Sequence, residues 1–285
     1  TTVAQGDVGE ITVELDETTT GSVVIGNAES DNYQANISIE DGNDDGEVTV
    51  LFNTFLAGDD DDAIVTAEAG DDDDIATIEN EGDSIQELGD FLDTGDYDVS
   101  VSPTGLDENG NAGAALDDES DIGSLIIEER STSEEITLWR TTSDVLSDVT
   151  DVQDDEDDEA AVEAITGGVE DGVVTETDSV AVGSSNDVLV HQIGVTGLEG
   201  AIAAEDTSNA EALEALANGD SIALNLTEQN PGANQDPHAV SLGDEITADD
   251  LEVVYDDANG DYYVFLDAGD LTDAEDGETY EVEFT

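Results

Sequence analysis

Hydrophobic and polar residues alternate along most of the first half of the chain, and this alternation is typical of half-buried β-strands. In segment 10–15, Ile11, Val13 and Leu15 fall on one face, and segment 33–39 repeats the pattern from Tyr33. Further strands are expected at 22–26, 47–55, 63–67, 75–78, 97–101 and 123–128. Because turns rich in glycine and aspartate separate these short strands, the pattern favours an antiparallel β-sandwich.

The second half continues with β-type segments and adds a helix. Strands are expected at 131–142, 179–182, 188–195, 221–227, 252–255, 262–266 and 279–284. The turn at 257–261 contains Asn259-Gly260, which predicts a hairpin. A helix over 210–217 has Ser208 to cap it and Gly219 to end it. The acidic run 151–159 is expected to form a solvated turn or the start of a short helix that continues through 160–165.

These elements together predict an all-β protein. We expect two immunoglobulin-like antiparallel β-sandwich domains, one over residues 1–130 and one over 131–285. The second domain is expected to contain one or two short helices.

The charge of the chain limits the conditions under which such domains fold. There are 78 acidic residues and two basic ones, Arg130 and Arg140, so the formal net charge is −76. Unscreened repulsion at this charge is on the order of hundreds of kcal/mol, whereas a domain is stable by only about 5–15 kcal/mol. At about 1 M ionic strength the Debye length is roughly 3 Å, and distant charges no longer interact. The chain is therefore expected to need molar salt or bound cations, as a protein of an extreme halophile does.

High charge is also typical of disordered chains. Against disorder, the regular segments 48–52, 262–266 and 280–284 contain aromatic and β-branched residues that can bury apolar surface. We therefore expect a folded chain.

Composition also excludes classes of function and partner. Nucleic acids and anionic membranes both require clustered basic residues, and no apolar run approaches the roughly 18–20 residues that span a bilayer. With only His191 and His238, no cysteine and no nucleophile motif, the chain is expected not to be an enzyme. Without lysine or cysteine, any polymer must be non-covalent, so the expected partners are copies of the chain and cations.

Two loops have oxygen ligands at alternating positions, as calcium loops do. The candidate ligands are Asp41, Asn43 and Asp45 in one loop, and Asp107, Asn109 and Asn111 in the other. The first loop has Phe52 at the twelfth position, where a calcium loop needs glutamate. Calcium or another hard cation is therefore one interpretation, and a solvated acidic turn is the other. The runs 59–62 and 71–74 are expected to attract a diffuse cation atmosphere.

Two sequons, at Asn36 and Asn225, are candidate acceptors for N-linked glycans. Each lies in a predicted strand, so its asparagine is expected to point outward, away from the apolar face. Chance occurrence of the three-residue motif is the alternative.

The first fifteen residues are a candidate assembly segment. The alternating strand with Ile11, Val13 and Leu15 is able to add to the sheet edge of a neighbouring copy. Such head-to-tail contacts generate filaments. The alternative is that the strand pairs within its own domain.

Several stretches of the chain resemble the haloarchaeal surface (S-layer) glycoproteins and their secreted relatives. These are GSLIIEERST (123–132), HQIGVTGLEGAIAA (191–204), LNLTEQNPGANQDP (224–237) and the closing NGDYYVFLD and GETYEVEFT, and the opening stretch 21–54 is similar to the immunoglobulin-like domain of that family. The resemblance implies an extracellular structural subunit that forms a surface lattice or a filament. A calcium-dependent adhesion module or a glycan-binding module is the alternative.

Since the sequence starts at Thr1 and contains no methionine, removal of a signal peptide is expected, and loss of the initiator methionine alone is the other reading.

The charge argument makes a direct prediction about salt. In dilute, metal-free buffer the chain should lose its cooperative thermal transition and its β-sheet circular dichroism, and both should return above about 1 M NaCl. A cooperative transition that persists in dilute, metal-free buffer would contradict the argument.

Overall fold

The computed structural model describes most of the 285-residue chain. The described residues are 1–58, 64–67, 74–79, 88, 91–130, 132–155, 158–181, 186–205, 207–219, 221–231, 233–271 and 277–285. The acidic runs 59–62 and 71–73 lie outside them. The chain divides into two compact units, Thr1–Ser131 with Thr196–Ala204, and Thr132–Val195 with Glu205–Thr285.

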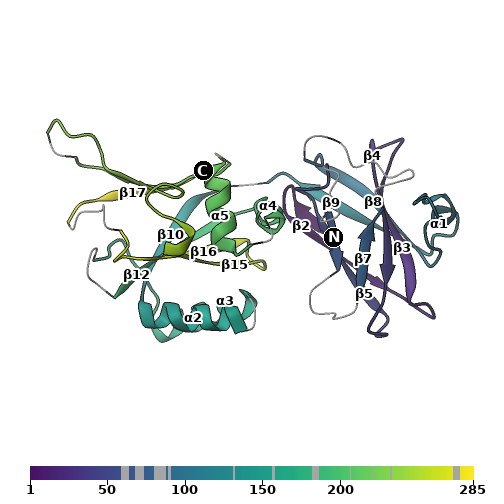
Figure 1. Ribbon diagram of the computed structural model, residues 1–285, viewed down its shortest axis with the longest axis horizontal. Coiled ribbons are helices and arrows are strands. Elements are labelled where there is room, and N and C mark those ends of the chain that lie inside the picture. The colour runs from purple at the N-terminus through teal and green to yellow at the C-terminus, as the bar shows by residue number, and fades with distance from the viewer. Residues whose placement is uncertain are drawn as a thin grey trace. The chain divides into compact units, whose positions relative to one another are not determined.

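The first unit is a sandwich of two sheets (Figure 1). The larger sheet has the order β1 (Thr2–Ala4), β9 (Asp121–Glu128), β8 (Gly95–Ser102), β3 (Thr20–Asn27), β4 (Tyr33–Glu40) and β7 (Ile75–Ile78). The smaller sheet has the order β2 (Val8–Glu14), β5 (Glu47–Asn53) and β6 (Val65–Ala67). All neighbouring strands are antiparallel except β1 and β9, which are parallel.

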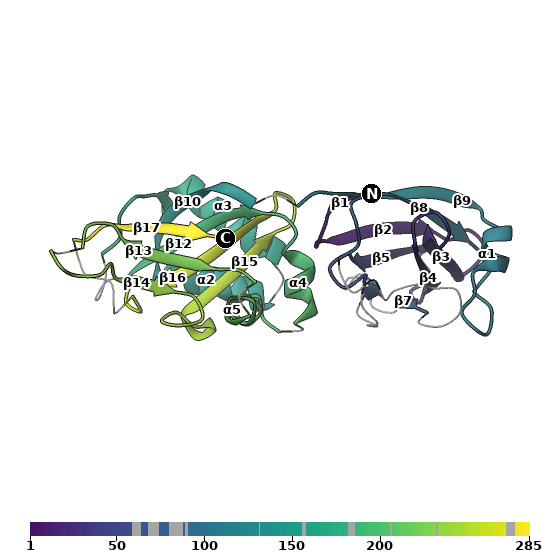
Figure 2. The same ribbon diagram turned by 90° about the horizontal axis from the view of Figure 1, so that it is seen from above.

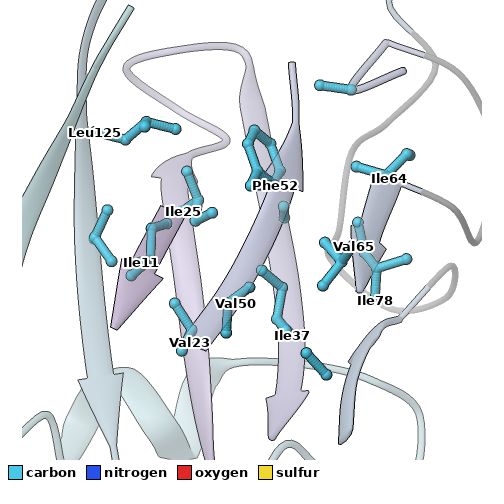
Figure 3. Close-up of a cluster of buried hydrophobic side chains, with 14 of the residues drawn as sticks. Ile11, Val23, Ile25, Ile37, Val50, Phe52, Ile64, Val65, Ile78 and Leu125 are labelled. Carbon is cyan, nitrogen blue, oxygen red and sulfur yellow. The ribbon is translucent and has the colours of Figure 1, made fainter. Parts of the chain in front are cut away.

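The apolar faces of the two sheets meet in one core, where alternating side chains point toward one another (Figure 3). Ile25 and Ile37 of the larger sheet and Phe52 of the smaller one are fully buried. The ring of Tyr33 lies edge-on to Phe52, with 6.4 Å between centroids. The alternation read from the sequence therefore places these side chains correctly, because one face of each strand has to leave water.

The larger sheet is also covered on its outer face, which the alternation did not predict. Ser22 and Asn36, which point away from the core, are 0% exposed. The segment that follows β8 contains α1 (Gly113–Asp117), and its Ala112 and Ala115 are buried. This segment is held to the sheet where the Ser22 hydroxyl donates to the carbonyl of Thr104, at 2.8 Å.

The second unit is built around a five-stranded sheet. Its order is β11 (Thr175–Glu176), β10 (Thr132–Thr142), β12 (Asp187–Val195), β16 (Asp261–Asp267) and β15 (Leu251–Asp256). A three-stranded sheet has the order β14 (Ala239–Ser241), β13 (Leu224–Glu228) and β17 (Tyr280–Phe284), and the short 3-10 helix η2 (Ala248–Asp250) precedes β15. All of these neighbours are antiparallel.

Helices cover one face of the five-stranded sheet, and the smaller sheet lies over the other (Figures 1 and 2). The covering helices are α2 (Ser143–Asp155) and α3 (Asp158–Asp171). Val149 of α2 and Ile165 of α3 pack with Val190 and Phe265 of the sheet. The apolar residues recur at helical spacing, while Asp148 of α2 and Glu163 of α3 are exposed. The described parts of the acidic run, 151–155 and 158–159, thus belong to two successive helices rather than to a turn.

Other expectations for this unit are confirmed. Helix α5 (Asn209–Asn218) begins at the predicted cap, where the Ser208 side chain accepts from the Glu211 backbone N–H, and it ends at Gly219. The predicted hairpin joins β15 to β16, and Gly260 has a φ of 68°, which favours glycine. The strand expected at 179–182 is absent from 179–181, and the short β11 precedes it. With 42% of the described residues in strands and 21% in helices, the all-β fold class is confirmed.

His191 occupies the middle of β12 and is fully buried. It lies between Leu138 of β10 and Val264 of β16. Neither ring nitrogen has a hydrogen-bond partner in the described part of the chain. Burial lowers the pKa of His191 to about 4, and the backbone of Val264 opposes this shift only in part. The imidazole is therefore neutral in the folded chain near neutral pH.

This buried imidazole makes stability depend on pH. Because the folded-state pKa of about 4 lies below the ordinary 6.5, the unfolded state binds the proton first as the pH falls. The stabilisation present above pH 6.5 should fall by about 3 kcal/mol by pH 4, and His191→Leu should remove this loss. Urea unfolding in molar NaCl would measure the difference between the two proteins. The matched variant Ile193→Val should shift stability by the same amount at each pH, and a His191→Leu profile parallel to that of the unaltered chain would contradict the prediction.

Candidate functional site

The first candidate cation loop follows β4, and its side chains bond to the loop's own backbone. Asp41 is 5% exposed, and its two carboxylate oxygens accept the N–H groups of Asp44, at 2.7 Å, and Gly46, at 3.0 Å. Asn43 accepts the N–H of Asp45 at 2.8 Å. Gly46 has a φ of 90°, where a side chain would be strained. These oxygens therefore shape a tight turn.

The second candidate loop is closed in the same way. One oxygen of Asp107 accepts the backbone N–H groups of Asn109, at 2.8 Å, and Asn111, at 3.0 Å. The Asn111 side-chain amide donates to the other oxygen at 2.9 Å. The bonds from Asn111 and Asn109 hold the pKa of Asp107 below its ordinary value, so this carboxylate stays ionised.

Within the described ranges, no group of three or more His, Cys, Asp or Glu side chains is arranged to hold a metal ion. Calcium binding by either loop therefore stays a prediction of the sequence.

The two arginines neutralise little of the negative charge on the surface. The guanidinium of Arg140 lies 3.9 Å from the carboxylate of Asp187, and Arg130 lies over the ring of Phe91, 5.1 Å from its centroid. An exposed ion pair at this distance contributes about 0–1 kcal/mol. Neutralisation of the surface thus depends on cations from solution.

Asn36, the first sequon, points away from the apolar face as expected, but it does not reach solvent, so the prediction of an accessible glycan acceptor is wrong. It is 0% exposed, and its amide donates to the carbonyl of Gly110 at 2.9 Å. Its side-chain oxygen accepts from the amide of Gln34, at 2.9 Å. The reason is the covering segment after β8, which buries the outer face of β4. Asn36 thus fastens the 107–111 loop to the sheet, and the folded chain has no room for a glycan on this nitrogen.

Asn225, the second sequon, lies in the middle strand of the three-stranded sheet. It is half-buried and lies on the face opposite to Leu224 and Leu226, which are buried. Its cross-strand neighbours are Ser241 of β14 and the exposed Glu283 of β17. Its amide is therefore on the more exposed face of this sheet.

The predicted assembly strand belongs to the core of its own unit in the single chain. Strand β2 pairs with β5 over its whole length, from Val8 opposite Asn53 to Glu14 opposite Glu47. Ile11, Val13 and Leu15 are 8%, 3% and 9% exposed. Beside this strand a groove of about 610 Å³ opens between β2 and the β8–β9 end of the larger sheet.

A buried polar cluster that sequence reasoning missed ties segment 196–204 into the first unit. The carboxylate of Asp7 accepts the N–H groups of Gly197, at 2.7 Å, and Glu199, at 3.2 Å. Burial raises the pKa of Asp7, and these backbone bonds oppose the shift. The N–H of Gly200 donates to the carbonyl of Gly6 at 2.9 Å, and a side chain on Gly200 would meet that oxygen at 2.5 Å. No local sequence pattern predicts this contact, because the two bonded residues are about 190 positions apart in the chain.

In the described part of the chain, no helix is both long and apolar enough to cross a membrane. The elements of the molecule thus define a β-rich, strongly acidic protein of two compact units with buried polar ties.

Comparison with known proteins narrows this class. Residues 1–104 match a family model described as a domain of unknown function (DUF7827). Over 275 residues, or 94% of the chain, the sequence is 36% identical to a cell surface glycoprotein of Haloferax gibbonsii, and this match covers 26% of that protein. It is 32% identical over 298 residues to cell surface glycoprotein 1 of Haloarcula hispanica, covering 96% of the chain and 29% of that protein.

The chain is therefore a homologue of the haloarchaeal cell surface glycoproteins, and the resemblance read from its sequence is confirmed. It spans less than a third of the length of these relatives. The homology supports a location at the cell surface.

The burial of Asn36 gives a prediction that separates a structural role from a glycan acceptor. Asn36→Ala should destabilise the chain by about 1–3 kcal/mol, because the Gly110 carbonyl loses its donor. Ser38→Ala removes the sequon but keeps the asparagine, and should change stability by no more than about 0.5 kcal/mol. Thermal unfolding in molar NaCl measures both. Equal destabilisation by the two variants, or a loss of attached mass in Ser38→Ala, would contradict this assignment.

Proposed function

We propose that the chain is a non-catalytic structural subunit of the cell surface of a halophilic archaeon. In this proposal it associates with copies of itself into a lattice resembling an S-layer, or into a filament. The observation that carries the proposal is the homology of at least 93% of the chain to cell surface glycoproteins.

The negative charge of the chain limits the ways in which copies of it can associate. Two surfaces with this excess of carboxylates repel each other unless cations lie between them. Cohesion in this proposal therefore comes from contacts in molar salt, with cations screening or bridging the acidic faces. Because the chain has neither lysine nor cysteine, the cohesion is non-covalent.

The exchange of residues 1–15 between copies is the link that the sequence suggested. It would require β2 of one copy to pair with β5 of the next, in the register seen within one chain. As β2 is an edge strand of its sheet, its exchange would leave the other strands in place. In the single chain, however, β2 already completes its own core, and we expect copies to meet through other surfaces.

N-linked glycans are part of the proposal, and Asn225 is the acceptor that we assign. The support is its place on the more exposed face of the three-stranded sheet, where a glycan would extend away from Leu224 and Leu226. The buried Asn36 is the matched control, on which no glycan is expected.

The proposal is tested by imaging material from the native host. Negative-stain microscopy and sedimentation in molar salt should show an ordered polymer that dissociates when the salt is removed. Mass spectrometry of the same material should find hexose on the peptide with Asn225. Monodisperse monomers at high protein concentration in molar salt would contradict the structural role.

A pair of cysteines distinguishes strand exchange from other contacts. The hydroxyls of Thr12 on β2 and Thr49 on β5 lie 3.4 Å apart across the strands. Since the chain contains no cysteine, Thr12→Cys with Thr49→Cys introduces a single pair. A disulfide within one chain and unchanged assembly is the expected result. A ladder of covalently linked chains on a non-reducing gel would show that β2 is exchanged.

A further inference from the structure

The second unit contains a pocket of about 210 Å³ between α3 and the five-stranded sheet. It is lined by Trp139, Ile165, Thr166, Val169, Val174, Val190, Gln192 and Tyr263. None of these eight residues is charged, although 28% of the chain is charged. The pocket is thus a neutral concavity in a polyanion, and it contains the only tryptophan of the chain.

A row of polar groups runs along the wall formed by the sheet. The indole N–H of Trp139 donates to the side-chain oxygen of Gln192 at 2.9 Å, and the amide of Gln192 donates to Asp261 at 2.7 Å. These two bonds fix the orientation of the Gln192 amide. One N–H and one lone pair of this amide remain for a ligand.

Two further residues that line the pocket, Thr166 and Tyr263, have hydroxyl groups. In the described part of the chain, neither the hydroxyl of Thr166 on α3 nor that of Tyr263 on β16 has a protein hydrogen-bond partner. Burial first, and then the carboxylates of Asp261 and Asp256, raise the pKa of Tyr263 to about 12. Its hydroxyl therefore keeps its proton at physiological pH and is able to donate.

The shape and chemistry of the pocket restrict the ligand. Drug-sized ligands occupy pockets of about 300–1,000 Å³, so this smaller one suits a single ring. A neutral lining gives an ion no counter-charge. Aromatic and aliphatic walls with fixed amide and hydroxyl groups suit a ligand that has an apolar face and hydroxyl groups at its edge. An aliphatic side chain would fill the volume but would leave these polar groups unpaired, at a cost.

We propose that this pocket binds one neutral pyranose ring, with the apolar face of the sugar against Trp139 and Tyr263 and its hydroxyl groups bonded to Gln192 and Thr166. Val169, which lines the pocket, is 38% exposed, so part of the apolar wall is open to solvent. The site is independent of self-assembly, so its failure would leave the structural role intact.

The single tryptophan makes the proposal measurable with the unmodified chain. Three sugars are added separately to the chain in molar NaCl. Methyl α-glucopyranoside and methyl α-mannopyranoside represent the terminal residue of a glycan, and glucose represents a free monosaccharide. At least one of the three should cause a saturable shift of the Trp139 emission, with half-saturation in the millimolar range. Sorbitol, an open-chain polyol without a ring face, should cause no saturable shift.

Two variants of α3 provide the controls. Thr166→Phe fills the pocket from an exposed helix position and should weaken the binding at least about tenfold. Glu163→Phe adds the same ring at an exposed position outside the pocket and should leave binding unchanged. Absence of a saturable shift with all three sugars, or an equal shift with sorbitol, would overturn the proposal. A shift that follows protein concentration without sugar would overturn it too, because it would mean that a side chain of a second copy fills the pocket.

Discussion

Repulsion among carboxylates is the constraint on which the rest of this molecule depends. The 78 acidic residues are opposed within the chain by only two arginines, which leaves a formal net charge of −76. One lies 3.9 Å from a carboxylate, and the other rests over an aromatic ring. The compact state is therefore a joint property of the chain and its ionic medium. The apolar cores bring the strands together, and we expect dissolved cations to screen the repulsion that opposes them.

Inside each unit, buried polar side chains tie segments that are distant in the sequence to one another. Asn36 holds a loop to the outer face of the larger sheet, and Asp7 accepts backbone donors of segment 196–204. The second unit keeps a neutral pocket with an ordered amide at Gln192. Such directional bonds in buried places are weakly screened by salt, so we expect them to remain effective in molar salt.

Alternation and capping signals carried much of the fold prediction, because they depend on neighbours close in sequence. The strands around Ile11, Val23 and Ile37 were expected, and α5 begins at Ser208 as predicted. The hairpin of α2 and α3 was underestimated, because the acidic run 151–159 resembles a solvated turn. The residues on either side of this run, Val149 and Ile165, are buried because they pack against the five-stranded sheet. The local sequence does not show that packing partner.

The sequence by itself determined the β class and the likeness to haloarchaeal surface glycoproteins, and it predicts the demand for salt, since composition, alternation and homology are all read along one dimension. Only the tertiary structure decided that Asn36 is buried and that segment 196–204 belongs to the first unit. It also decided that uncharged residues from α3 and three strands enclose a pocket. Burial and enclosure depend on segments that are distant in the chain, and no local pattern specifies which distant segment will cover a given face.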